Sequence, residues 1–283
     1  MGAKRLKVRG FVTAIVALLG ALALPGAMAN AAIRSPTTQP LLLHLPGVGG
    51  YRGIDRNMLR GLRQGGVAFN IQVYDWTRDR PALDALHGYQ FNLRQAQNLA
   101  DLITAHARAF PNSPIVLTSH SGGAAIAIWA LERLPADVHV QALFMLAPAL
   151  SPMYNLTPAL RHVTDRAYSF NSTQDQLVLG WGCRLCGTMD GLKTDAAGLV
   201  GFRRPPMADP SQYAKLFQVG YNPAWIALGD IGDHIGTLST PFAADILAPL
   251  VRSVVLAVNQ AHLADAIPST RPVPALTLLN PNH

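Results

Sequence analysis

Two serines in one short turn-like segment are the residues best placed for chemistry. The segment IVLTSHSGGAAIAIWAL, residues 115–131, begins as an apolar β-type run and ends as a helix-type run. Only Ser-His-Ser-Gly-Gly, residues 119–123, stands between the two. A strand that passes directly into a helix must turn sharply, and small residues are needed on both sides of the apex to avoid collisions. A serine at such an apex can serve as a nucleophile.

The position of the glycines selects Ser121 over Ser119. In the strand–turn–helix motif G-x-S-x-G, a glycine follows the nucleophile by two residues, and Gly123 has this relation to Ser121. Ser119 takes the place of the first glycine, as one small residue for another. We therefore expect Ser121 to be the nucleophile, with the positive end of the following helix favouring an oxyanion. The alternative is an ordinary serine N-cap.

A second glycine-rich segment could help to bind an oxyanion. In LLLHLPGVGGYRG, residues 41–53, an apolar strand is followed by Pro-Gly-Val-Gly-Gly. Acyl transfer needs backbone N–H groups directed at the developing oxyanion. We expect one from Gly122, which follows the serine, and one from Val48, with Gly49 as the alternative. Neither G-x-G-x-x-G nor G-K-[ST] is present here, which disfavours a phosphate-binding loop.

An acid and a base should follow the serine, each at the end of a later strand. Asp175 lies just past a β-type run in RAYSFNSTQDQLV, and His234 lies in the loop ALGDIGDHIGTLS after the last candidate strand. His234 would accept the proton of Ser121. Asp175 would hold the tautomer of the imidazole and stabilise its cation.

Other acids and histidines fit these roles less well. Asp165 precedes its strand, and Asp230 is close to the candidate histidine in sequence rather than on a separate strand. His120 is next to the serine, but neighbouring side chains on a sharp turn point apart. His44 lies within a strand, where we expect it to be buried and hydrogen-bonded.

A largely parallel sheet would bring these residues together. Apolar β-type runs occur at 41–45, 67–76, 114–119, 139–146, 166–170 and, with a weaker pattern, 215–221. Helical patterns include 90–110, 123–134 and a last helix at 242–258, which Pro249 should bend. This alternation predicts an α/β fold with about six strands and helices on both faces. Active groups gather at the carboxyl ends of the strands in such a sheet.

In their order along the chain, HLPGVGG, SHSGG, NSTQD and GDHIG resemble the motifs of α/β-hydrolases, over about residues 40–260. The resemblance implies an α/β-hydrolase-like fold without a large cap domain, and a serine hydrolase of the esterase or lipase kind. Two departures concern the subfamily. Ser119 replaces the first glycine of the nucleophile elbow, the sharp turn at residues 119–123, and Pro46-Gly47 stands where the family usually has His-Gly.

The chemistry implied is cleavage of a small-molecule or lipid ester through an acyl-enzyme, without cofactor or metal. Thioesterase, amidase or acyltransferase activity would use the same three residues. The alternative class is a catalytically silent binding module. The complete serine, acid and histidine set argues against it.

The longest excursion from the expected sheet, residues 177–212, should border the substrate pocket. Its apolar walls would be Trp181, Leu185 and Met189. The alternative is a surface loop remote from the chemistry. The same segment holds the only two cysteines, Cys183 and Cys186. A structural zinc site would need two further ligands, and no second C-x-x-C or H-x3-H is present. In an exported protein we expect a local disulfide.

The N-terminus indicates export. AKRLKVRG, FVTAIVALLGALAL and PGAMANA form a basic, an apolar and a small-residue part, as in a signal peptide cleaved after Ala29 or Ala31. A retained anchor is the alternative, but the apolar part is short for a bilayer. We expect a signal peptide (1–31), a linker (32–40), an α/β-hydrolase domain (41–262) and a Pro-rich tail (263–283).

The location would then be secreted or periplasmic, with no stable membrane insertion once the signal is cleaved. Four of the 23 basic residues lie at positions 4–9, and the others nearly balance the 16 acidic residues. No basic stripe indicates a nucleic-acid partner.

Overall fold

The computed structural model describes residues 40–254 of the 283-residue chain. The predicted signal peptide, the predicted C-terminal tail, residues 255–262 of the predicted domain and all of the predicted linker except its last residue lie outside the described residues. No helix within the described part is long and apolar enough to cross a membrane.

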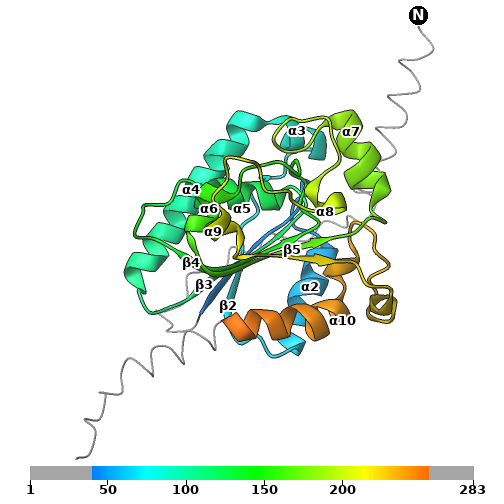
Figure 1. The fold of residues 1–283 in the computed structure, drawn as a ribbon. Coiled ribbons are helices and arrows are strands. Elements are labelled where there is room, and N and C mark those ends of the chain that lie inside the picture. The colour runs from blue at the N-terminus through cyan, green and yellow to red at the C-terminus, as the bar shows by residue number, and fades with distance from the viewer. Residues whose placement is uncertain (1–39, 255–283) are drawn as a thin grey trace, which may run out of the picture.

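Six strands form one sheet in which every neighbouring pair is parallel, in the order β2-β1-β3-β4-β5-β6 (Figure 1). The strands are β1 (Leu41–Leu45), β2 (Asn70–Val73), β3 (Ile115–His120), β4 (Val140–Leu146), β5 (Val163–Asn171) and β6 (Leu216–Gly220). All six predicted β-type runs are confirmed as strands. The order reverses at β1, whose neighbours are β2 on one side and β3 on the other. The carboxyl ends of β1 and β3 therefore border the switch-point crevice, where ligands bind in open α/β sheets.

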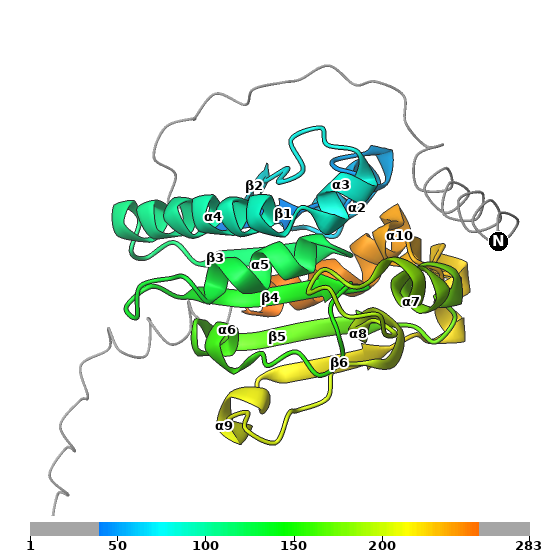
Figure 2. The same ribbon diagram turned by 90° about the horizontal axis from the view of Figure 1, so that it is seen from above.

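Helices cover both faces of the sheet (Figures 1 and 2). One face carries α3 (Ala82–His87), α4 (Tyr89–Ala109), α5 (Gly123–Leu131) and α6 (Thr157–Arg161). The other carries α2 (Gly53–Gln64), the 3₁₀ turns Pro223–Leu228 and Gly236–Leu238, and the last helix. The predicted helix at 90–110 corresponds to α4, and that at 123–134 begins at Gly123 as expected.

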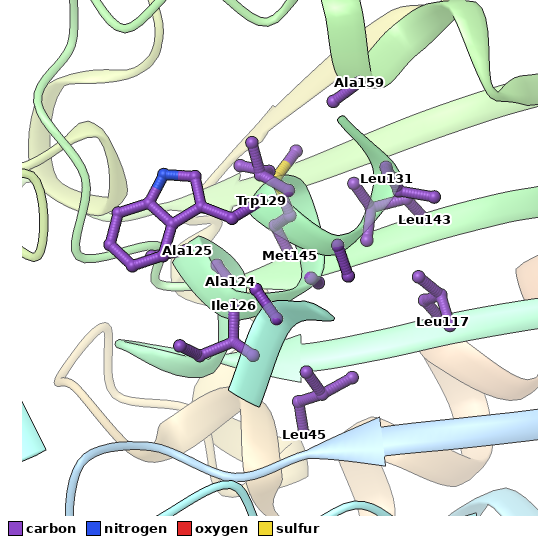
Figure 3. Packing of buried hydrophobic residues seen from close by; sticks show 14 of the residues in the cluster. Leu45, Leu117, Ala124, Ala125, Ile126, Trp129, Leu131, Leu143, Met145 and Ala159 are labelled. Atoms are coloured by element: carbon purple, nitrogen blue, oxygen red, sulfur yellow. The ribbon is translucent and has the colours of Figure 1, made fainter. Parts of the chain in front are cut away.

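Apolar residues on both sides of the central strands explain this layering. Along β1, Leu43 belongs to the core cluster under α4 and α5, whereas its neighbour Leu42 belongs to the cluster under α2. Strands buried on both faces read as continuous apolar runs rather than as alternating ones. Every residue of α5 is buried, and Figure 3 shows its side chains above Leu45, Leu117 and Leu143 of three adjacent strands. A helix that is apolar all round must be enclosed, as α5 is.

The last helix contains a π-helical turn. It consists of α10 (Thr240–Phe242), the π-helical segment Ala243–Leu247 and further helical residues up to 254. Pro249 has no N–H and therefore cannot donate to the carbonyl group of Asp245, which lies within the π-helical segment. The bend predicted at Pro249 stays a prediction, and the last four residues of the predicted helix, 255–258, lie outside the described residues.

The excursion between β5 and β6 consists of short helices. They are a π-helix (Gln176–Gly182), α7 (Cys183–Cys186), α8 (Ala197–Val200) and α9 (Pro210–Tyr213). The predicted disulfide is absent, since Cys183 and Cys186 are both free thiols. Their environments differ, because Cys183 is buried in the apolar core and Cys186 is only half-buried. Burial is also the main cause that raises the pKa of the Cys183 thiol to about 12.

Candidate active site

The turn after β3 holds Ser121 in a strained backbone conformation. Its φ is 52°, in the left-handed region that costs a residue with a side chain about 1–3 kcal/mol. Three backbone hydrogen bonds maintain this conformation. The Ser121 N–H donates to the carbonyl oxygen of Leu146 on β4 at 2.9 Å, and the Ser121 carbonyl accepts from Ala124 at 3.1 Å and from Ala149 at 3.2 Å.

Close packing on both sides of the turn explains the small residues of the pentapeptide. A Cβ at Gly123 would lie 2.5 Å from the carbonyl oxygens of both Leu45 and Pro46. On the other side, Ser119 is fully buried, and its hydroxyl donates to the carbonyl oxygen of Phe144 at 3.1 Å. The place of the first glycine therefore accepts a serine, because a backbone carbonyl accepts the hydrogen bond of its hydroxyl.

We expect Gly123→Ala to lower the free energy of unfolding by about 3 kcal/mol, the upper end for overpacking, because backbone atoms would have to move. Urea denaturation measures this change. Gly49→Ala is the matched control, because a Cβ at Gly49 meets nothing within 4 Å, and its effect should stay below about 1 kcal/mol. Equal effects of the two substitutions would contradict the proposed need for a glycine at 123.

A serine, a histidine and an acid meet at the carboxyl edge of the sheet. The Oγ atom of Ser121 lies 2.9 Å from Nε2 of His234, and Nδ1 of His234 lies 2.6 Å from Oδ2 of Asp175. All three are buried, with exposed fractions of 5% for Ser121, 6% for His234 and 3% for Asp175. The structure thus brings together the three residues that the sequence selected.

The partners of His234 determine its tautomer. An ionised carboxylate can only accept, so Nδ1 must carry the hydrogen that is donated to Asp175. In the neutral ring, Nε2 is then the acceptor and receives the hydrogen bond of the Ser121 hydroxyl. In this arrangement the imidazole can accept the serine proton, and the nearby carboxylate would stabilise the resulting cation.

Two loops hold the acid and the histidine in place. Asp175 lies four residues beyond the end of β5, and its Oδ1 accepts from the N–H of Leu179 at 3.4 Å at the start of the π-helix. The loop of His234 is joined to the same region, because the Ser172 hydroxyl donates to the carbonyl oxygen of Gly232 at 2.6 Å. Contacts between these two loops therefore support the pair of side chains.

The glycine-rich loop after β1 lies directly against the serine. A Cβ at Gly47 would lie 3.3 Å from Cβ of Ser121, and one at Gly122 would lie 2.7 Å from Cγ1 of Val48. The loop is anchored from beyond β2, since the indole of Trp76 donates to the carbonyl oxygen of Pro46 at 2.7 Å. Within residues 40–254, the N–H groups of Val48 and Gly122 have no hydrogen-bond acceptor. Two unpaired donors beside the serine suit an oxyanion.

The three residues that were expected to line the pocket differ in burial and in their contacts with the serine turn. Met189 is buried, with its sulfur 3.0 Å from the place of a Cβ at Gly122, and its N–H donates to the carbonyl oxygen of Ala149 at 2.9 Å. Trp181 and Leu185 are exposed by 56% and 40%. Of these three residues, Met189 is therefore the one that packs against the serine turn.

His120 is the residue that sequence reasoning missed. Its side chain does not point away from the site, because its ring packs against that of His234 with the centroids 4.8 Å apart. A local pattern could not show this contact, since it depends on the folding of a loop more than a hundred residues later. By contrast, His44 is buried and hydrogen-bonded within β1, as predicted. Among the described residues, no group of three or more histidine, cysteine or acidic side chains could hold a metal ion.

A parallel sheet with a sharp serine turn at its switch point, and with an acid and a histidine after later strands, defines the α/β-hydrolase-like class of fold. No protein-family model matches the sequence, and no curated protein matches it either.

Solved structures with a similar fold include three at low identity. A protein from Xanthomonas campestris assigned to the alpha/beta hydrolase superfamily is 20% identical, with a TM-score of 0.43, and 76% of this chain and 99% of that chain are covered. A cutinase-like protein from Cryptococcus sp. is 16% identical, with a TM-score of 0.41 and coverages of 77% and 95%. A cutinase from Trichoderma reesei is 14% identical, with a TM-score of 0.41 and coverages of 88% and 90%.

Proposed function

We propose that the protein is a serine hydrolase that cleaves carboxylic ester bonds through an acyl-enzyme on Ser121. The observation that carries the proposal is the line of hydrogen bonds from the Ser121 hydroxyl through His234 to Asp175, at 2.9 Å and 2.6 Å. Its position at the switch point, beside the N–H groups of Val48 and Gly122, supports the proposal further.

In the first half of the reaction, the Ser121 oxygen attacks the carbonyl carbon of the ester while its proton passes to Nε2 of His234. The substrate oxygen becomes an oxyanion, for which the N–H groups of Val48 and Gly122 are the proposed donors. Asp175 stabilises the imidazolium without taking its proton. When the tetrahedral intermediate collapses, His234 returns that proton to the departing alcohol, and the acyl group remains on the serine.

In the second half, a water molecule takes the place of the alcohol. His234 accepts a proton from the water as its oxygen attacks the acyl carbon, and a second tetrahedral intermediate forms. Its collapse breaks the bond to the Ser121 oxygen, which recovers the proton from His234, and the carboxylic acid is released. No metal or cofactor takes part in this cycle.

Labelling with a fluorophosphonate probe tests the nucleophile, because such probes phosphonylate only activated serines. We expect the wild-type protein to be labelled and Ser121→Ala to remain unlabelled. Ser119→Ala is the matched control. It removes the other serine of the pentapeptide, whose hydroxyl donates to a backbone carbonyl, and labelling should persist.

Labelling that persists in Ser121→Ala would rule out this nucleophile. Absence of labelling in every form would favour the silent binding module. Nitrophenyl esters, the corresponding thioesters and the corresponding amides would then separate esterase activity from thioesterase and amidase activity. A product ester formed in the presence of an added alcohol would identify acyl transfer.

The site of action is proposed to be outside the cytoplasm, in the secreted or periplasmic fraction. This part of the proposal rests on the basic, apolar and small-residue parts of the first 31 residues, which lie outside the described structure. The mass of the exported protein measures whether cleavage occurs after Ala29 or Ala31.

A further inference from the structure

His120 belongs to the elbow, and its side chain also contacts the loop of His234 and the proposed oxyanion loop. It immediately precedes Ser121 in the elbow. Its Nε2 lies 2.9 Å from the carbonyl oxygen of His234, and the two rings lie 4.8 Å apart at an angle of 49°. On its other side, Nδ1 lies 3.1 Å from the place of a Cβ at Gly47, in the proposed oxyanion loop.

The partner of His120 determines its tautomer. A carbonyl oxygen only accepts, so Nε2 carries the hydrogen that is donated to His234. Burial and the nearby His234 lower the pKa of the His120 imidazole to about 3. The ring therefore stays neutral at physiological pH, and no second cation opposes the imidazolium that forms on His234 during the proposed reaction.

The titratable side chains around His120 are held by hydrogen bonds of their own. Within the described residues, the charged or titratable side chains that act on it are His234, His44 on β1 and Asp55 on α2. The last two are paired, with Nε2 of His44 3.0 Å from Oδ1 of Asp55, and Nδ1 of His44 lies 3.1 Å from the hydroxyl oxygen of Thr118. Because His44 and Asp55 are hydrogen-bonded to each other, they do not compete for the Nε2–H of His120, which donates to the carbonyl oxygen of His234.

We propose that His120 is a positioning residue that fixes the loop of His234 relative to Ser121 by donating Nε2–H to the carbonyl oxygen of His234. The inference rests on the proposed function and adds a residue to it. Because His120 and Ser121 are consecutive, the base is tied to the rigid dipeptide that carries the nucleophile. A displacement of about 1 Å in such a site can slow catalysis about 100-fold.

A pair of substitutions separates this role from general packing. In His120→Gln, the amide nitrogen is as many bonds from Cβ as Nε2 is and can donate to the same carbonyl oxygen. In His120→Asn, the amide is one bond shorter and cannot reach. Both side chains are neutral amides. We expect kcat and the rate of fluorophosphonate labelling to fall about 10- to 100-fold in the asparagine variant, with KM within about 2-fold. The glutamine variant should recover most of the rate.

The NMR signal of the hydrogen on Nδ1 of His234 gives a second readout that does not require activity. We expect this signal to persist in the wild type and in His120→Gln, and to broaden or disappear in His120→Asn as the loop exchanges with water. Equal rates for the two variants, or an unchanged signal in the asparagine variant, would overturn the inference.

The two readouts also separate this inference from the proposed function. If the wild type is not labelled by fluorophosphonate, the proposed function fails, and the NMR signal alone then tests the positioning role of His120. Its loss only in His120→Asn would then support the positioning role, and an unchanged signal in both variants would overturn it.

Discussion

Alanine at Ser121, at His234 or at both positions is expected to lower kcat by the same factor, about 10⁶. The reason is that the two side chains act as one unit. Without His234 no base accepts the proton of the serine, and without Ser121 the imidazole has no nucleophile to activate. The hydrogen bond of 2.9 Å between Oγ and Nε2 is the structural basis of this dependence. The remaining rate would come from substrate binding and from the proposed oxyanion donors.

The measurement is kcat for a nitrophenyl ester in the wild type, the two single variants and the double variant. KM should change little, because neither substitution removes the walls that bind the substrate. A double variant that is slower than the wild type by the product of the two single-variant factors, rather than by one such factor, would contradict a shared mechanism. Ser119→Ala serves as the control for a serine lost from the same buried turn and should retain kcat within a few-fold.

The sheet was predictable because each strand is a short apolar run bounded by turn residues. The elbow was predictable for a related reason, since steric limits at the turn leave their pattern in five consecutive residues, 119–123. The location of Asp175 and His234 after later strands followed from the geometry of parallel sheets, and their order is the one that the resemblance to α/β-hydrolases implies. These features depend on short runs of consecutive residues or on the order of motifs along the chain, and both can be read from a single sequence.

Contacts between distant loops could not be read in this way. The packing of His120 against His234 depends on how the loop after β6 folds back over the elbow. The place of Met189 against Gly122 depends on a hydrogen bond to the backbone at Ala149. The C-x-x-C spacing predicted a disulfide, but the spacing does not show that Cys183 is buried in the apolar core.

Asp175→Asn is expected to lower kcat about 10⁴-fold at neutral pH while leaving the fold intact. The asparagine amide can donate to Nδ1 of His234, which favours the tautomer with its hydrogen on Nε2. That nitrogen then cannot accept the serine proton, and the imidazolium also loses its stabilising charge. The effect should appear in kcat, with KM nearly unchanged, and unfolding in urea should show that the variant remains folded.

Asp230→Asn is the matched control, because Asp230 is a buried acid in the same loop as His234. Its Oδ1 accepts from the N–H of Gly232 at 2.8 Å, and burial raises its pKa. An asparagine oxygen can accept the same hydrogen bond, so kcat should stay within a few-fold. If Asp230→Asn instead gave the large loss and Asp175→Asn the small one, the carboxylate 2.6 Å from His234 would not be the group that orients it. Both substitutions keep the shape of the side chain and remove the same charge. A difference in kcat between the two variants therefore shows which of the two carboxylates the reaction requires.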